Sequence, residues 1–428
     1  MPARSSRLSL ISRLHCPRAH SRRTVALLPA LSLVLALALS LLAAPACALA
    51  QNQAQTKSAP AAQSRTDTAP LVLRTMGSLA FGGTVTQKSD GETFHGEHGY
   101  AQYYIPEQSR DYPLILWHGV GQSGRCWETT PDGREGYQAL LPRHGWSTYI
   151  VDQPRRGRAG YTSVVPTEKT VDPTTTRESF TWTAFRNGLW VPPARPTLYK
   201  GSQFPDDPAS IDQFFREQTP NTGDEPRDNA HRAVMGRTMT ALLERTGPAI
   251  LVTHSNSGQY GWFTGMMAGD RLKAIVAYEP GQLAFPDDEP ELDVPSGNAE
   301  AAALQKGIIV PARDFANLVR VPILLVYGDN IHRQVSDILH LEVWRISLAR
   351  ARAFVDCINR RGGDATLLVL PELGIYGNTH ALYADRNNRQ VLDLTECWLH
   401  ERGLDSRNHP HTGPGPSPVT QDTIPLQR

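Results

Sequence analysis

The chain has 428 residues, with 43 Lys and Arg against 42 Asp and Glu, so its formal net charge is +1. A nucleic-acid-binding protein usually carries a basic bias, and this even balance argues against that class. The five cysteines include no Cys-x-x-Cys pair and no Cys/His cluster with zinc spacing, so we expect no structural metal.

Residues 1–50 predict a secretory signal peptide. A basic start ending at Arg22 and Arg23 precedes an apolar run over residues 25–44, and Ala48-Leu49-Ala50 is a small-residue cleavage pattern. The alternative is a retained membrane anchor, because the run is nearly long enough to span a bilayer. The "SRRTVAL" segment also resembles a twin-arginine signal. We therefore expect export by the Sec or the twin-arginine route to the periplasm or the medium, with no membrane attachment after cleavage.

Residues 51–68, rich in Gln, Ala, Ser and Thr, predict a flexible lead-in, and residues 406–428, rich in Pro and Gly, predict a disordered tail. Between them, residues 69–405 predict one α/β domain. An antiparallel strand pair is expected first, at 71–83 and 99–107. Apolar runs then predict buried strands at 112–119, 147–154, 249–255, 273–280, 321–329 and 365–372. Helices are expected at 228–247, 257–269, 336–363 and 388–403. This alternation predicts a mostly parallel sheet with helices on both faces.

Residues 157–228 interrupt the alternation with a long segment rich in Pro, Thr, Gly and aromatic residues. Loops of this length inside a compact domain are usually functional. We therefore expect a lid or a pocket wall there.

The stretch "PAILVTHSNSGQYGW", residues 248–262, runs from a predicted strand into a predicted helix through two serines. In hydrolases of this architecture the nucleophile lies on such a sharp turn, and the residues two positions before and after it must be small. Ser255 has Thr253 and Ser257 in these positions, whereas Ser257 would have the bulky Gln259. The sequence predicts Ser255 as the nucleophile; the alternative is an ordinary polar turn.

A serine nucleophile needs a histidine base and an acid, in the chain order Ser, acid, His. His380 follows the last predicted strand, in a Gly/Asn-rich loop before the final helix. Two acids are possible: Asp329 and Glu279 each end a predicted strand. Position alone slightly favours Asp329, and the alternative role of each acid is to cap or brace a loop.

The oxyanion hole requires two backbone N–H groups. One is expected from Asn256, after the nucleophile, and the other from Val120 or Gly121, after the strand that ends in His118-Gly119.

The segment Gly119–Gly124, "GVGQSG", also fits the GxGxxG pattern of dinucleotide-binding proteins. That pattern requires a helix that begins within the glycines, but Pro131-Asp132-Gly133 predicts a turn soon afterwards. Two strands also precede this unit, whereas a dinucleotide-binding domain normally begins with it. A nicotinamide cofactor is therefore disfavoured.

Other residues allow two interpretations each. Cys357 and Cys397 are the preferred disulfide pair among Cys126, Cys357 and Cys397, with three buried thiols as the alternative. The acidic loop 287–295 fits a solvated surface better than a Ca²⁺ site. The remaining question is whether the aromatic residues near Ser255 line a pocket or pack in the core; these are Trp117, Trp127, Tyr260 and Trp262.

With these residues in place, the chain resembles the α/β-hydrolase superfamily and, within it, the esterase-713-like bacterial esterases. The resemblance runs from about Leu71 to Gly403. It is carried by "LRTMGSLAFGG", "WHGVGQSGRCWETTPDGREGY", "VDQPRRGRAG", "THSNSGQYGW", "AYEPG" and "GIYGNTHALYADRNN". The resemblance implies a serine esterase, in some members acting on esters of cyclic compounds. It implies Glu279 as the acid and Val120 and Asn256 as the oxyanion donors. Some relatives have adjacent cysteines where this chain has Val120-Gly121, so the pocket chemistry is expected to differ.

These observations lead to one expectation for the whole chain: an exported serine carboxylesterase with the α/β-hydrolase fold, using Ser255, His380 and Glu279. It needs no cofactor or metal, its partner is a small-molecule ester, and a homodimer is left open. A lactonase or thioesterase would share the same residues. A non-catalytic binding module on this fold is the alternative from another class.

Overall fold

The computed structural model describes residues 69–87, 89–159, 176–222 and 225–416. The chain divides into two units, Met1–Thr68 and Ala69–Arg428, and every described residue belongs to the second unit. The expected signal peptide and lead-in lie outside the described residues.

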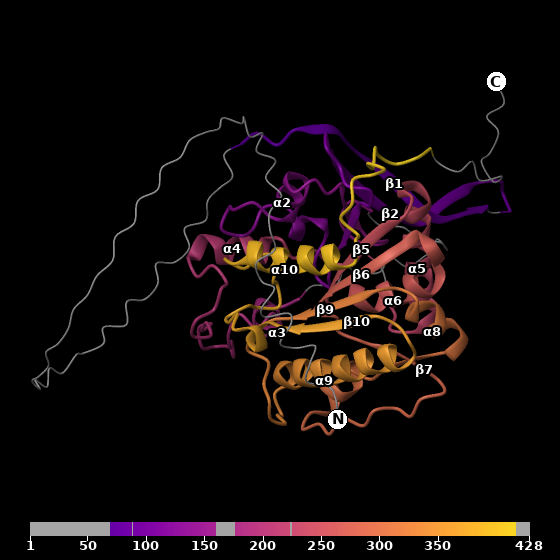
Figure 1. Cartoon of the computed structure of the whole chain (residues 1–428). Helices are drawn as coiled ribbons and strands as arrows, with labels where there is room; N and C mark the ends of the chain where they lie inside the picture. The colour runs from indigo at the N-terminus through magenta and orange to yellow at the C-terminus, as the bar shows by residue number, and fades with distance from the viewer. Residues whose placement is uncertain (1–68, 88, 160–175, 223–224, 417–428) are drawn as a thin grey trace, which may run out of the picture. The chain divides into compact units, whose positions relative to one another are not determined.

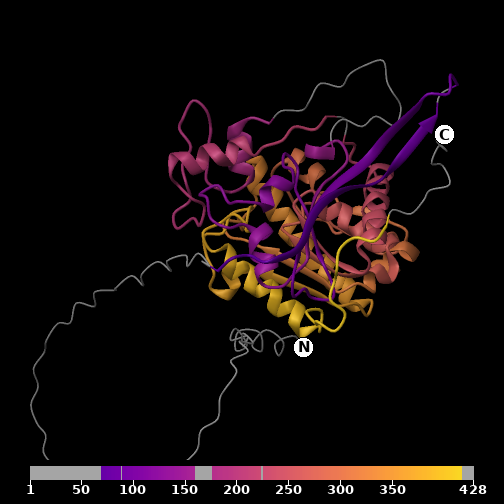
Figure 2. The same cartoon turned by 90° about the horizontal axis from the view of Figure 1, so that it is seen from above.

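An eight-stranded sheet forms the centre of the second unit (Figure 1). β2 pairs antiparallel with β1 and with β4, and all other neighbours run parallel. Figure 2 shows β1 and β2 extending beyond the other strands as a hairpin. The spatial order is β1 (Leu73–Gln87), β2 (Thr93–Pro106), β4 (Thr148–Asp152), β3 (Leu114–Trp117), β5 (Ala249–His254), β6 (Leu272–Tyr278), β9 (Ile323–Tyr327) and β10 (Ala365–Val369). The predicted α/β class with a mostly parallel sheet is confirmed.

Helices cover both faces of the sheet. The main hydrophobic core joins one face to α5 (Asn229–Thr246), α6 (Ser257–Met267), α8 (Ala312–Val319) and α9 (Leu339–Arg360). On the other face, Leu116 of β3 lines a small apolar space together with Leu141 of α2 (Tyr137–Arg143) and Leu392 of α10 (Asn388–Glu401). Figure 1 accordingly shows α9 and α10 on opposite sides of β9 and β10.

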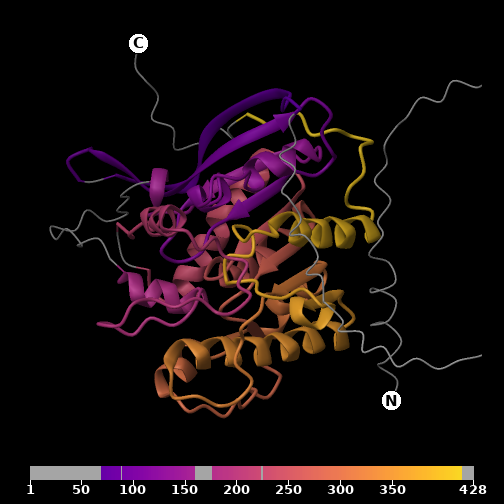
Figure 3. The ribbon, with the colours of Figure 1, turned by 90° about the vertical axis from the view of Figure 1, so that its left-hand side faces the viewer.

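The connections contain short elements. These are η1 (Gly124–Trp127), η2 (Gly157–Ala159), η3 (Gly269–Arg271), η4 (Leu370–Leu373), α7 (Ala299–Leu304) and the parallel pair β7 (Ala284–Pro286) and β8 (Ile308–Val310). The predicted insertion contributes α3 (Glu178–Ala184) and α4 (Pro208–Arg216). They pack through T-shaped contacts of Trp182 and Phe214 with Phe204 and of Phe185 with Phe214. In Figure 1 the arrowheads of β9 and β10 point toward α3 and α4, and Figure 3 views the protein from that side.

The tail prediction needs correction for residues 406–416. The imidazole of His411 is buried, its Nε2 lies 2.9 Å from the hydroxyl of Tyr149, and its carbonyl accepts a 2.6 Å hydrogen bond from Ser109 Oγ. Arg245 Nε donates to the carbonyl of Gly415 at 2.9 Å. Composition suggested disorder, but one buried side chain and these hydrogen bonds fix the segment. The remaining residues, 417–428, lie outside the described part.

The expected disulfide between Cys357 and Cys397 is absent. Cys357 of α9 packs in the main core with Ala365 of β10. The next residue, Thr366, accepts a 3.0 Å hydrogen bond from Trp398 of α10. Because successive strand residues point to opposite faces, α9 and α10 lie on different sides of the sheet. The two thiols are therefore separated by β10.

Candidate active site

Ser255 lies on the sharp turn between β5 and α6. Its φ of 54° is in the left-handed region, which costs a non-glycine residue about 1–3 kcal/mol. The backbone comes close here, since a Cβ atom on Gly258 would lie only 2.6 Å from Cβ of Pro280. Ser257 Oγ is buried and binds the carbonyls of Trp117 and His254, each at 3.0 Å. Of the two serines, Ser257 stabilises the turn and Ser255 lies at its strained point.

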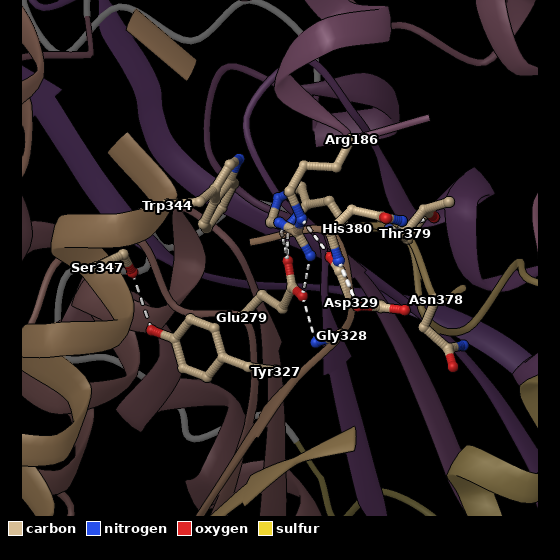
Figure 4. A network of polar contacts seen from close by, with 12 residues as sticks. Arg186, Glu279, Tyr327, Gly328, Asp329, Trp344, Ser347, Asn378, Thr379 and His380 are labelled. Carbon is tan, nitrogen blue, oxygen red and sulfur yellow. Dashed lines mark hydrogen bonds and ion pairs between the residues drawn. The ribbon is translucent and has the colours of Figure 1, made fainter. Parts of the chain in front are cut away.

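Glu279 and His380 meet at the carboxyl end of the sheet. Glu279 directly follows β6 with φ of 47°, and His380 lies in the loop between η4 and α10. Nδ1 of His380 is 2.5 Å from Oε2 of Glu279, and both side chains are buried (Figure 4). A carboxylate only accepts hydrogen bonds, so Nδ1 carries the proton. In the neutral ring, Nε2 then carries no proton and is free to accept a proton.

Two opposing effects set the ionisation of this pair. Burial opposes the charge on Glu279, but Arg186 and His380 outweigh it and lower the pKa of Glu279 to about 2. Burial lowers the pKa of His380 below its ordinary value; Glu279 acts in the opposite direction and Arg186 in the same direction. The arrangement therefore favours an ionised Glu279 beside a neutral imidazole at neutral pH.

His254 connects the serine turn to the His380 loop. Its Nε2 donates to the carbonyl of His380 at 2.9 Å, and the two ring centroids are 4.4 Å apart. Among the described residues, the Ser255 hydroxyl makes no hydrogen bond with His380. Such bonds are often long in the absence of substrate and shorten when it binds.

Asp329, the alternative acid, makes no hydrogen bond with the ring of His380 among the described contacts. One carboxylate oxygen accepts a 2.7 Å hydrogen bond from the N–H of Gly377, and the other accepts one from the N–H of Asn330. The N–H of Asp329 in turn donates to the carbonyl of Asn378 at 2.8 Å. Asp329 therefore braces the loop that carries His380.

The loop after β3 lies against the serine. A Cβ atom on Gly119 would lie 2.9 Å from Cβ of Ser255, so only glycine fits without a shift. His118 Nε2 accepts from the N–H of Gln153 at 3.3 Å, so Nδ1 carries the proton and donates to the carbonyl of Gly119 at 2.8 Å. In a trans peptide the N–H of Val120 points away from that carbonyl. In the described structure, neither this N–H nor that of Asn256 has a hydrogen-bond partner.

Arg186, from the insertion, is a residue of the candidate site that sequence reasoning missed. Its guanidinium is buried and binds both carboxylate oxygens of Glu279, with Nη1 at 2.8 Å from Oε2. The one available signal is a single cation in the otherwise uncharged segment "SFTWTAFRNGLW". Neither charge nor spacing in that segment indicates its partner.

The glycine pattern at residues 119–124 does not open a long helix. It leads into η1, a single 3₁₀ turn, and the next helix begins only at Tyr137. Asp152, which would contact a ribose in a dinucleotide site, instead accepts from the N–H of Gly124 at 2.5 Å and from Arg158 Nε at 2.8 Å. The glycines therefore serve the turn rather than a dinucleotide fingerprint.

The aromatic residues near Ser255 pack in the core. Trp117, Tyr260 and Trp262 belong to the main hydrophobic cluster, and Trp127 is fully buried, with its ring centroid 4.3 Å from that of Tyr383.

In the acidic loop 287–295, Asp288 binds Arg361 at 2.6 Å and Asp287 accepts from the first N–H of α8 at 2.9 Å. Arg361 and a backbone N–H therefore occupy the carboxylates of Asp288 and Asp287.

Comparison with known proteins supports this architecture. No family model matches the chain. The solved structure of a novel bacterial esterase has 29% sequence identity and a TM-score of 0.61, covering 78% of this chain and 97% of that chain. "Probable secreted lipase phiG" from a fungal species is 27% identical over 333 residues, 71% of this chain and 86% of that protein. Within the described residues, no helix is long and apolar enough to cross a membrane. The strand order, the turn at Ser255 and these similarities together place the chain in the α/β-hydrolase superfamily.

Proposed function

We propose that the protein is an exported serine carboxylesterase. The observation that carries the proposal is the buried 2.5 Å contact between His380 Nδ1 and Glu279 Oε2, beside a serine on a left-handed turn. The bacterial esterase and the secreted lipase among similar proteins support ester hydrolysis, and the lipase also supports export. Substrates are carboxylic esters, with esters of cyclic or aromatic compounds as the expected range.

The proposed mechanism passes through an acyl-enzyme. Ser255 Oγ attacks the ester carbonyl carbon while Nε2 of His380 takes its proton. Glu279 holds the ring through Nδ1 and stabilises the imidazolium. The N–H groups of Val120 and Asn256 donate to the oxyanion, each contributing about 3–4 kcal/mol. His380 then protonates the departing alcohol, and a water molecule, deprotonated by His380, hydrolyses the acyl-serine.

The test is hydrolysis of a short-chain p-nitrophenyl ester by the protein without its signal peptide. Ser255→Ala should lower kcat by about 10⁶-fold, while labelling by a fluorophosphonate should disappear. An active Ser255→Ala variant would contradict the proposed nucleophile. Labelling without ester turnover would point to a lactone or thioester substrate, and neither labelling nor turnover would favour a binding module.

A further inference from the structure

Three consecutive residues of the insertion dock onto the candidate site. The carbonyl of Ala184 accepts a 2.7 Å hydrogen bond from Trp344 Nε1 on α9. The carbonyl of Phe185 accepts a 2.8 Å hydrogen bond from the backbone N–H of His380. Residue 186 then extends its guanidinium to the acid. Two backbone carbonyls therefore hold this part of the insertion to α9 and to the His380 loop, independently of the charge on Arg186.

Arg186 completes the set of donors around Glu279. Oε2 receives Nη1 of Arg186 at 2.8 Å and Nδ1 of His380 at 2.5 Å; Oε1 receives Nη2 of Arg186 and the N–H of Gly328 at 2.6 Å (Figure 4). A carboxylate has about four lone-pair positions, and here four donors fill them. The acid therefore has one orientation, with Oε2 held against the imidazole.

The arginine is itself held in a strained, buried position. Its φ is 54°, its Nε donates to the carbonyl of Asp329 at 2.9 Å, and its guanidinium lies 5.0 Å from the ring of Trp344. Left-handed φ values at non-glycine residues persist where surrounding contacts enforce them, often at functional sites. Ser255 and Glu279 share this backbone conformation.

We propose that Arg186 is a positioning residue for the hydrolysis: it fixes the Glu279 carboxylate against His380 and, as a buried cation, opposes protonation of the imidazole. This inference rests on the proposed function. Because Arg186 offsets the charge of Glu279, the base stays neutral at a lower pH than it would beside an unpaired carboxylate. Displacing residues 184–186 would separate the buried Glu279 carboxylate from its cation, which costs a large amount of free energy. These residues therefore form a fixed wall of the candidate site.

Other charged or titratable groups act on the same pair and are kept in every variant. They are His254 of β5, Tyr327 of β9 and Asp385 of the His380 loop. Tyr199 of the insertion acts on Arg186, and Asp329 after β9 binds Arg186 through its backbone carbonyl.

The decisive experiment is an NMR titration of His380 in protein labelled with ¹³C-histidine, its resonance being the one that disappears in His380→Gln. Arg186→Gln should raise the pKa of His380 by about one unit or more, because a cation within contact of the pair is removed. The acidic limb of kcat/KM should move by the same amount. Arg186→Lys keeps the charge but loses the two-pronged geometry, so kcat should fall about tenfold with little change in KM.

Arg345→Gln is the matched control, because Arg345 makes a comparable two-pronged ion pair with Glu342 on α9. It should leave the pKa of His380 and the pH profile unchanged. An unshifted His380 in folded Arg186→Gln would overturn the inference. Should Arg186→Gln not fold, Arg186→Lys decides, and wild-type kcat in that variant would overturn it. A wild-type protein without esterase activity or fluorophosphonate labelling would refute the proposed function, while the titration would still report on Arg186.

Discussion

The carboxylate of Asp329 accepts a 2.7 Å hydrogen bond from the N–H of Gly377, three residues before His380. Asp329 occupies the strand end where an acid of this fold most often lies, yet it contacts the backbone of the histidine loop and not the imidazole. The acid that contacts the imidazole follows the neighbouring strand. The two carboxylates therefore have different roles, which their positions at strand ends do not reveal.

Glu279→Gln should therefore lower kcat far more than Asp329→Asn. The amide in Glu279→Gln lacks the charge that stabilises the imidazolium, and we expect a loss of about 10⁴-fold. Asp329→Asn keeps an oxygen for Gly377, and a small displacement of the loop should cost less than about 100-fold. The measurement is kcat for a p-nitrophenyl ester, with circular dichroism to verify folding. The opposite ranking would return Asp329 to the triad.

The pH dependence follows from the lowered pKa of His380. Only the neutral imidazole takes the serine proton, so kcat/KM should be constant above the pKa of His380 and fall as pH drops through it. Because burial, joined by Arg186, lowers the pKa, the midpoint should lie below 6.5. A pH–rate profile between pH 4 and 9 measures it. A midpoint above 6.5 would show that Glu279 dominates instead.

Gly258→Ala should destabilise the serine turn. The added Cβ would lie 2.6 Å from Cβ of Pro280, so the backbone must shift, at a cost of about 1–3 kcal/mol. Gly281→Ala is the control, because no heavy atom beyond its chain neighbours lies within 4 Å of its Cβ position and its φ is not positive. Thermal unfolding and kcat are the measurements. Equal effects of the two substitutions would contradict the tight fit at Gly258.

Glu217 should make stability depend on pH. Burial raises the pKa of this carboxyl from 4.5 to about 7, and Arg125 and Gln122 offset only part of the effect. Between these values the folded state binds a proton that the unfolded state has lost, so stability should decrease as pH rises from about 4.5 to about 7. Glu217→Gln lacks this titration. Its Tm relative to wild type should therefore rise across that range by a few degrees, and a constant difference would refute the assignment.

The fold could be predicted from the sequence because its signals are local. Each parallel strand is a short apolar run, and in β3, β4, β5 and β9 every residue is buried, as strands covered on both faces require. Asp228, the first residue of the expected helix 228–247, caps α5 by accepting from the N–H of His231 at 2.7 Å. The prediction of disorder from local composition was wrong for residues 406–416, because the burial of His411 orders a segment that is rich in turn-forming residues.

The site was predictable only in part. Ser255 and His380 follow from the strand-to-helix turn and from chain order, both visible locally. Choosing Glu279 over Asp329 required a resemblance, since each acid ends a strand. Arg186 could not be predicted, because its contact with Glu279 joins residues 93 positions apart. Such a contact depends on how the insertion folds back over the sheet, which periodicity does not specify.

The docking of residues 184–186 also bears on how substrate range could diverge among relatives. An insertion whose Arg186 forms an ion pair with Glu279 cannot be exchanged as an independent module. A chimera in which residues 157–228 are replaced entirely would place a foreign segment opposite Glu279. A chimera that keeps residues 184–186 would keep the native ion pair between Arg186 and Glu279. Recombination in this protein should therefore keep residues 184–186 together with the histidine loop that they contact.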